Sequence, residues 1–201
     1  TARLMGSSVL MSQSSVALVY GDHQVASGIG LGAVAGFEDR RAVELLDDGL
    51  LLKGEPVRGK VGQPSVPLSL NPDGAFAIGI KVGRRSVDVL LVDFTGAVRR
   101  RWSMDYRYPE PGPLLAEIAR RLKELKRVLP AADFERVQGV GIAAPLSLGG
   151  WRTLLDMPTD VAARWMDTDL QAEVARLTAL PVTLLKDTAS ACVAELLAGR
   201  G

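Results

Sequence analysis

The chain has 201 residues, of which 47% are hydrophobic, and a formal net charge of +1 at pH 7. This length suits one or two globular domains with a sizeable core. The small net charge gives no overall attraction to nucleic acid or membrane, so binding to either would require a local patch of positively charged residues. A single cysteine, Cys192, and a single histidine, His23, exclude an internal disulfide and a cysteine-rich zinc site. Without a long apolar run or a readable signal peptide, we expect a cytoplasmic protein.

The first third of the chain changes character twice. Residues 1–36 are rich in Ser, Gly, Ala and Val and carry little charge. Charged residues then alternate with spaced apolar ones over 37–54, which predicts a helix that ends near Gly49, because glycine is favoured just past a helix end. Residues 50–70 predict two short strands around a basic loop that contains glycine.

A strong turn signal, NPDG at 71–74, follows and marks the predicted boundary between domains 1–72 and 73–201. The regular pattern beyond it predicts a mixed α/β sheet layered with helices. The predicted strands cover 75–82, 86–94, 97–108, 137–144 and 181–185, and the predicted helices cover 114–129, 170–180 and 188–198.

The segments DGAFAIGIKVG, VLLVDFTGAV, VGIAAP and LPVTLLKDTASACVAEL, in this order, resemble the ROK family of sugar kinases and sugar-responsive repressors over about residues 42–201. The resemblance implies the first lobe of an actin-like ATPase (ribonuclease H-like) fold, in which two similar lobes enclose the substrate. Repressors of the family carry a winged helix-turn-helix in front, and residues 47–74 resemble their wing and linker. Kinases of the family begin near the strand at 77–80, so the preceding segment favours a regulator.

The turn after the first strand of this lobe decides between the two activities. In the family's kinases that strand carries an aspartate that orders magnesium, and a Gly-Gly-Thr turn brings backbone amides to the phosphate. Here Lys81 takes the place of the acid, Gly83 remains, and Arg84, Arg85 and Ser86 replace the rest of the turn. An ammonium opposes Mg²⁺ binding, and we therefore expect neither a bound metal nor phosphoryl transfer. A lysine that extends from a strand end into solvent is the structural alternative.

The sequence LLKDTASA at 184–191 resembles the family's catalytic strand end, Asn-Asp, in which the aspartate is the general base toward a sugar hydroxyl. Asp187 matches the base, whereas Lys186 departs from the asparagine that holds neighbouring hydroxyls. We expect both positions to contact the sugar, with Asp187 no longer catalytic. The alternative for Asp187 is an N-cap of the helix that follows.

The loop GIAAPLSLGGW at 141–151 resembles the loop that lines the family's sugar cleft, and Gly149 and Gly150 would shape it. Trp151 and Trp165 are candidates to stack on a sugar ring, and the alternative is that they fill the core.

Two segments carry the expectation of DNA binding. Residues 2–19 resemble the second and third helices of a helix-turn-helix, with the start of the recognition helix at a polar tract. Short polar side chains there can meet phosphates and base edges in the major groove. The tract consists of Ser12, Gln13, Ser14 and Ser15.

In the predicted wing, Arg58 and Lys60 flank Gly59 and can contact the DNA backbone, a solvated basic turn being the alternative. The basic run RRRW at 99–102 is interpreted as a solvated strand edge rather than a nucleic-acid patch.

These observations predict a sugar-responsive ROK-type transcriptional regulator without kinase activity and without a cofactor. Its expected partners are operator DNA, a small sugar or sugar phosphate and a second copy of the chain, but no membrane. The alternatives are a sugar kinase that uses ATP and magnesium, or its remnant, and an inert fragment held by oligomer contacts. Residues for a second lobe, with its adenosine site and histidine–cysteine zinc motif, do not occur in the sequence, so we expect a fragment or a truncated product.

Overall fold

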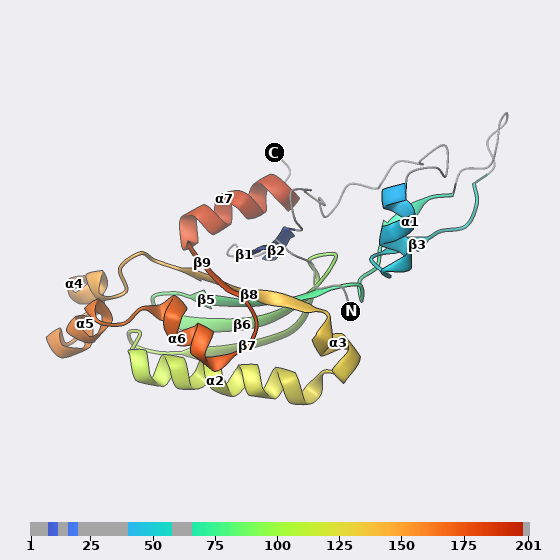
Figure 1. Ribbon diagram of the computed structural model, residues 1–201. Helices are drawn as coiled ribbons and strands as arrows, with labels where there is room; N and C mark the ends of the chain where they lie inside the picture. The colour runs from blue at the N-terminus through green and yellow to red at the C-terminus, as the bar shows by residue number, and fades with distance from the viewer. Residues whose placement is uncertain (1–7, 12–15, 20–39, 58–65, 199–201) are drawn as a thin grey trace.

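The computed structural model describes residues 8–11, 16–19, 40–57 and 66–198 (Figure 1). Two hairpins and one helix come first along the chain. These elements are β1 (Ser8–Met11), β2 (Val16–Val19), α1 (Arg40–Asp47), β3 (Leu51–Lys53) and β4 (Leu68–Leu70). None of the helices in these four ranges is both long and apolar enough to cross a membrane.

The main body is a five-stranded mixed sheet in the order β7-β6-β5-β8-β9. Strands β5, β6 and β7 form antiparallel pairs, whereas β8 runs parallel to both β5 and β9. Tight turns make the hairpins, and helical crossovers make the parallel pairs, as parallel strands require. The strands are β5 (Phe76–Val82), β6 (Ser86–Asp93), β7 (Val98–Asp105), β8 (Val137–Ala144) and β9 (Val182–Lys186).

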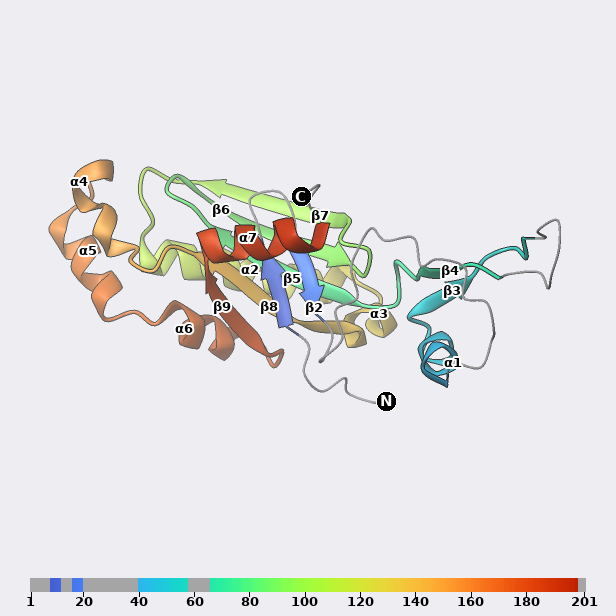
Figure 2. The same ribbon diagram turned by 90° about the horizontal axis from the view of Figure 1, so that it is seen from above.

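Helices cover both faces of this sheet (Figures 1 and 2). Helix α2 (Pro111–Val128) lies under one face and buries Leu114, Ile118 and Leu125 there, while α7 (Asp187–Ala198) and the β1–β2 hairpin lie over the other face. The other helical segments are α3 (Ala131–Glu135), η1 (Gly149–Trp151), α4 (Arg152–Leu155), α5 (Thr159–Met166) and α6 (Leu170–Leu177). A mixed α/β architecture is thus confirmed.

The core lies between the sheet and α2. Alternate residues of β5, among them Ile78, Ile80 and Val82, point to this side and are almost fully buried. Because side chains of a strand alternate between faces, the intervening residues, including Lys81, point to the α7 side. The strand order and the period of two therefore place the lysine on the face that carries the start of α7.

The predicted helix and hairpin of the first domain are confirmed. Helix α1 is followed by Gly49 with φ of +72°, the left-handed conformation that favours glycine, and β3 pairs antiparallel with β4. The NPDG turn also forms, with the Gly74 amide 2.9 Å from the Asn71 carbonyl oxygen. The domain boundary itself stays a prediction.

The α1–β3–β4 segment contacts the lobe beside the start of β5 and the end of β6. Leu50, Ala75 and Phe94 form a small buried cluster that spans the NPDG turn. A Cβ on Gly74 would lie 2.9 Å from the Gly49 carbonyl oxygen and 3.1 Å from the Leu50 Cα, so only glycine permits this close backbone approach. The hairpin is therefore attached to the lobe by buried contacts as well as by the chain.

The acid at the end of β6 organises the turn to β7. The Asp93 carboxylate accepts hydrogen bonds from Thr95 and from the Ala97 amide, and forms an ion pair with Arg99 at 2.6 Å. Burial alone would raise the pKa of Asp93, but these hydrogen bonds outweigh it and hold the pKa below its ordinary value. The basic run lies on edge strand β7 and is exposed, as the interpretation of a solvated strand edge requires, while the exclusion of a nucleic-acid patch stays a prediction. Arg99 and Arg101 of this run pair with Asp93 and Asp88.

The expectation of helices over residues 2–19 is wrong where the structure describes this segment. Residues 8–11 and 16–19 form an antiparallel hairpin, β1–β2, whose short apolar runs SVLM and VALV are typical of strands. The predicted base-contacting residues Ser12, Gln13, Ser14 and Ser15, and the wing residues Arg58 and Lys60, lie outside the described residues.

Candidate functional site

The predicted phosphate turn and the predicted base position lie together around one cavity of about 390 Å³. One wall is the turn between β5 and β6, with Lys81, Gly83, Arg84 and Arg85. Another part of the lining is the start of α7, where Asp187 and Thr188 lie, and Ala143 and Trp151 also line the cavity.

The topology explains this convergence. Strands β5, β8 and β9 are parallel, so their carboxyl ends meet at one edge of the sheet. Helix α7 begins directly after β9, and its first residues therefore reach the same edge as the turn after β5. Ligands of α/β proteins bind at this edge of a sheet, since loops and helix N-termini gather there.

Lys81 has a buried acid as its cross-strand neighbour. It lies opposite Asp88 of β6, a carboxylate that is only 6% exposed. The same Asp88 oxygen accepts hydrogen bonds from Arg101, with its Nη2 at 3.0 Å, and from the Ser103 hydroxyl. The Lys81 ammonium itself makes no hydrogen bond or ion pair with a described residue.

Asp88 was missed by the sequence analysis. The available signal was an acid at an alternating position of the apolar strand SVDVLLVD, which places it on the same face as its neighbour across the hairpin. Register cannot be read with certainty from one strand, and so the pair became visible only in the structure.

A tyrosine holds the turn between β5 and β6. The Tyr106 hydroxyl lies 2.8 Å from the Gly83 carbonyl oxygen and 2.7 Å from the Ser86 carbonyl oxygen, and it can donate its single proton to either. The Gly83 amide donates to the same Ser86 oxygen at 2.8 Å. Burial, with a contribution from the Asp88 charge, raises the pKa of Tyr106, so the hydroxyl keeps the proton that this contact needs.

The two arginines of the turn differ in their surroundings. Arg85 donates from Nη1 to the Arg107 carbonyl oxygen at 3.1 Å, whereas Arg84 makes no such contact with a described residue. Both are exposed, and both line the cavity. The turn thus presents cationic side chains where the family's kinases present small residues.

Asp187 is the first residue of α7 and is half-buried at the cavity wall. Its Oδ1 accepts a hydrogen bond from the Thr188 amide at 2.7 Å. A usual N-cap contacts the second or third amide of its helix, so this contact with the next residue does not match the capping alternative. Lys186 is exposed and does not line the cavity.

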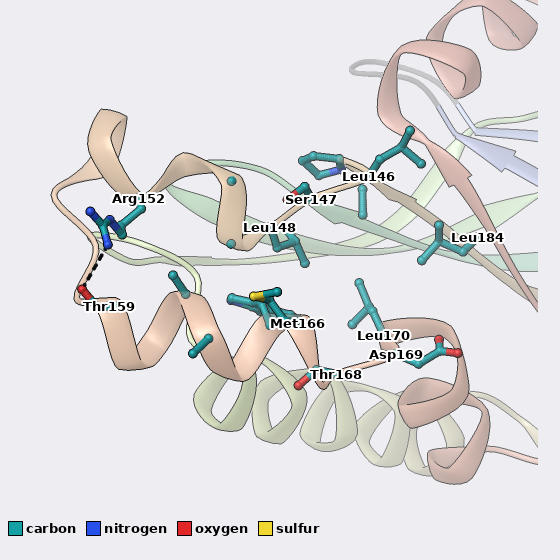
Figure 3. Close-up of a pocket in the computed structure, with 17 residues that line it drawn as sticks. Leu146, Ser147, Leu148, Arg152, Thr159, Met166, Thr168, Asp169, Leu170 and Leu184 are labelled. Carbon is teal, nitrogen blue, oxygen red and sulfur yellow. Dashed lines mark hydrogen bonds between the residues drawn. The ribbon is translucent and has the colours of Figure 1, made fainter.

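Gly149 and Gly150 line a separate cavity of about 780 Å³, between the loop after β8 and helices α5 and α6 (Figure 3). A Cβ on Gly149 would lie 2.7 Å from the Ala162 carbonyl oxygen, so this glycine allows the loop to pack on α5. Leu146 and Met166, which also line this cavity, are 77% and 87% exposed. The structure therefore does not bring these glycines into the cavity that holds Asp187.

The two tryptophans have different places. Trp165 belongs to the core and donates from Nε1 to the Pro109 carbonyl oxygen at 2.9 Å, which supports the core alternative. Trp151 is half-buried, packs against the core and also lines the cavity that holds Asp187, so the stacking alternative stays a prediction for this residue.

Magnesium in a kinase is held by one or two carboxylates together with the phosphates of the substrate. A hard divalent cation takes oxygen ligands, usually carboxylates, and Lys81 occupies the position of the expected one. Within the part of the chain that the structure describes, no three or more His, Cys, Asp or Glu side chains are grouped to hold a metal. Asp187 alone among the lining residues is an acid.

Comparisons with known proteins gave matches among solved structures alone. The chain matches no family model and no curated protein. One similar structure is a ROK family transcriptional regulator homologous to the Escherichia coli MLC protein, with 25% identity, a TM-score of 0.49 and coverage of 78% of this chain and 39% of that one.

Two kinases are also similar in structure. A Listeria monocytogenes protein assigned as an N-acetylmannosamine kinase has 21% identity to this chain and a TM-score of 0.44, and the match covers 63% of this chain and 40% of the Listeria protein. An inorganic polyphosphate/ATP-glucomannokinase from an Arthrobacter strain has 23% identity to this chain and a TM-score of 0.44, and the match covers 63% of this chain and 51% of the kinase. The chain thus spans about half or less of each of these proteins. The family that the sequence motifs resemble is represented among the structural neighbours.

Proposed function

We propose that the chain is the first lobe of a ROK-type, sugar-responsive transcriptional regulator that does not transfer phosphoryl groups. The motifs and the mixed sheet support the family. One observation carries the choice of a regulator: Lys81 lines the same cavity as Asp187, so the predicted base faces a cation instead of a metal-binding acid.

Electrostatics supports the loss of catalysis. Phosphoryl transfer depends on metal ions that neutralise the charge developing on the phosphate oxygens. Two like charges repel each other strongly at short range, so an ammonium near the phosphate turn lowers the local concentration of Mg²⁺. The buried Asp88 does not substitute for the missing acid, because Arg101 and Ser103 already engage it.

The first-domain segment supports a role with DNA. A short helix followed by a two-stranded hairpin, here α1 and β3–β4, is the arrangement in which a wing follows a helix. The buried cluster around Leu50 links this hairpin to the lobe, so packed side chains join the two parts whose coupling a regulator requires. In a complete regulator, sugar binding would shift the population of such a coupled arrangement.

A sugar kinase, or its remnant, is the second candidate. It is favoured by the position of Asp187, a half-buried carboxylate at the end of a parallel strand and on the wall of a cavity. The two candidates differ in one measurable property, phosphate transfer from ATP with Mg²⁺ to a hexose.

Two assays on the 201-residue chain test the proposal. With radiolabelled ATP and Mg²⁺, we expect no phosphorylation of glucose, fructose or N-acetylated hexosamines. In a gel shift with DNA from upstream of sugar operons, we expect retardation that weakens when Arg58 and Lys60 are both changed to Gln. Lys123→Gln, an exposed change on α2, is the matched control and should leave the shift unchanged.

The outcomes separate the candidates. Turnover that disappears in Asp187→Asn would establish a kinase instead. If the chain neither phosphorylates a sugar nor retards DNA, and if it forms a stable dimer in light scattering, an inert fragment held by oligomer contacts would be favoured.

A further inference from the structure

Strand β7 is an open edge of the main sheet (Figure 2). It is eight residues long and pairs with β6 on one side, and no strand among the described residues pairs with its other side. The opposite edge of the sheet is shorter and partly occupied. Strand β9 has five residues, and Gln171 of α6 donates from Nε2 to the Val182 carbonyl oxygen at 2.9 Å. An exposed edge as long as β7 is a template on which a further strand can form.

The pairing of β7 with β6 determines which backbone groups of β7 point outward. The Tyr106 amide, directly after β7, donates to the Arg85 carbonyl oxygen at 2.8 Å, so the backbone of Tyr106 points toward β6. These groups alternate in direction along an antiparallel strand, so those of Arg101, Ser103 and Asp105 point away from β6. All three residues are exposed. The edge therefore offers amides and carbonyls at the spacing that an added strand requires.

Three consecutive arginines, residues 99–101, give this edge a positive charge. Arg101 donates from Nε and Nη2 to the carboxylate of Asp88, which is buried, while the arginine side chain itself is 63% exposed. A guanidinium has five donor hydrogens, so Arg101 keeps donors for a partner. Arg100 is exposed and makes no hydrogen bond or ion pair with a described residue. Arg99 is already paired with two acids and contributes less.

The two faces of β7 favour different side chains in an added strand. Trp102 and Met104 are partly buried against the core, so an apolar residue opposite either of them would cover the part that is still exposed. Arg100 lies on the same face and Arg101 on the other, so an acid opposite each would form a cross-strand ion pair. A second copy of β7 would instead bring its own net charge of +2, from three arginines and Asp105, against the same charge.

We propose that β7 is a docking edge for an extended acidic segment of a partner protein, which joins the sheet as a further strand antiparallel to β7. The carboxylates of this segment would lie opposite Arg100 and Arg101, and its apolar side chains would lie beside Trp102 and Met104. Main-chain hydrogen bonds give such a complex its affinity, and alternate side chains give it specificity. The inference is independent of the proposed function, because it uses neither the cavity beside Asp187 nor the α1–β3–β4 segment.

Fluorescence anisotropy of a labelled peptide, titrated with the full 201-residue chain, tests the proposal. The peptide has about eight residues, matching the length of β7, with consecutive glutamates between valines and threonines. We expect this peptide to bind, and a peptide with lysine in place of each glutamate not to bind measurably.

Two N-methylated forms of the acidic peptide separate strand addition from attraction between charges alone. One form carries the methyl groups on its odd-numbered amides and the other on its even-numbered amides. Only one of these sets faces β7 in an added strand. One form should therefore bind like the unmodified peptide, and the other should bind at least about tenfold more weakly, because several backbone hydrogen bonds are lost.

Hydrogen exchange measured by NMR locates the added strand. In the free chain, the amides of Arg101 and Ser103 should exchange faster than those of Trp102 and Met104, which point toward β6. Saturating acidic peptide should slow exchange at Arg101 and Ser103 by at least about tenfold and leave Trp102 and Met104 unchanged.

Charge reversal tests the role of the arginines. Arg100→Glu should weaken binding of the acidic peptide roughly five- to tenfold, since an attraction is replaced by a repulsion. The same variant should bind more tightly a peptide that carries lysine only at the position opposite residue 100, a gain that a disturbed fold would not produce. Arg176→Glu on α6, which packs beside β9, is the matched control. It removes only an exposed ion pair with Glu173 and should bind the acidic peptide like the unchanged chain.

The proposal would be overturned by absent binding of the acidic peptide, by equal affinity for the two N-methylated forms, or by unchanged exchange at Arg101 and Ser103. Slow exchange at these amides without peptide, together with a dimer in light scattering, would assign the edge to a second copy of the chain instead. Slowing by a DNA duplex but not by the acidic peptide would assign the edge to nucleic acid.

Discussion

Reversal of the charge at position 81 is the sharpest perturbation that the structure offers. In Lys81→Asp a carboxylate would lie directly across the hairpin from the buried Asp88. The attraction between opposite charges would be lost and a repulsion between like charges gained. Arg101 and Ser103 still bond Asp88, so the acid is not left without partners.

The magnitude follows from the cross-strand geometry. A pair of opposite charges across two strands contributes roughly 0.2–1 kcal/mol, and like charges cost a similar amount. Lys81 is partly exposed and makes no direct ion pair, so the lower part of each range applies. We expect a total loss of about 0.4–1 kcal/mol in the free energy of unfolding, or about 1–4 °C in Tm for a chain of this size.

Magnesium should then act on the variant and not on the unchanged chain. The new carboxylate would share the cavity with Asp187, and a dissociation constant of about 1 mM would stabilise the variant by about 1.4 kcal/mol at about 10 mM Mg²⁺. Thermal unfolding followed by circular dichroism measures both effects, with NaCl at equal ionic strength as the salt control. Lys81→Met should lose less stability and show no response to Mg²⁺.

Two results would refute the reasoning about position 81. One is a Tm of Lys81→Asp equal to that of the unchanged chain, which would mean that the charge at position 81 does not interact measurably with the charge of Asp88. The other is an equal response to Mg²⁺ in the variant and the unchanged chain, which would place any metal elsewhere.

Three further changes test other parts of the structure. Gly74→Ala should cost about 1–3 kcal/mol in urea unfolding, because its Cβ would meet backbone, and an unchanged midpoint would contradict that contact. Asp93→Asn should cost about 1–2 kcal/mol at pH 7 through loss of the charge paired with Arg99. The pKa of Asp93 is lower in the folded chain than in the unfolded chain, where it is about 3.9. The stability difference between the unchanged chain and Asp93→Asn should therefore have its full size above about pH 3.9 and disappear as the pH falls through the folded pKa. A stability difference that does not change with pH would contradict this explanation. Tyr106→Phe should cost about 0.5–1.5 kcal/mol and speed hydrogen exchange at the Gly83 amide, and unchanged exchange would show that the hydroxyl does not hold the turn.

The sheet and its long helices were predictable from the sequence because their patterns are strong and local. The strand predicted over 137–144 coincides with β8, and the helix predicted over 114–129 coincides with α2 to within a few residues. The short helices α4 and α5 were not predicted, since four to eight residues after a proline or glycine carry too few periodic positions to identify a helix. The hairpin β1–β2 was predicted as helix because four-residue apolar runs fit either structure.

The site was predictable only in part. Position in the chain was enough to bring Lys81 and Asp187 to one edge of the sheet, because both follow parallel strands. The place of Asp88 depends on the pairing register of β5 and β6, and the role of Tyr106 depends on a contact with Gly83, more than twenty residues earlier in the chain. A single sequence specifies neither. Gly149 and Gly150 were assigned to the sugar cleft by resemblance, and their separate cavity reflects packing of the loop on α5.

Under the proposed function, the lysine at position 81 opposes metal binding and with it phosphoryl transfer. A kinase site must hold a metal ion and release its product, and its acid keeps the phosphate region neutral only when the metal is present. A lysine at that position makes the positive charge permanent, so an anionic ligand can bind without a metal and without being consumed. A sensor needs this property, because its occupancy must report ligand concentration instead of turnover. The arrangement of Lys81, Arg84 and Asp187 around one cavity therefore supports the proposal that this chain does not transfer phosphoryl groups.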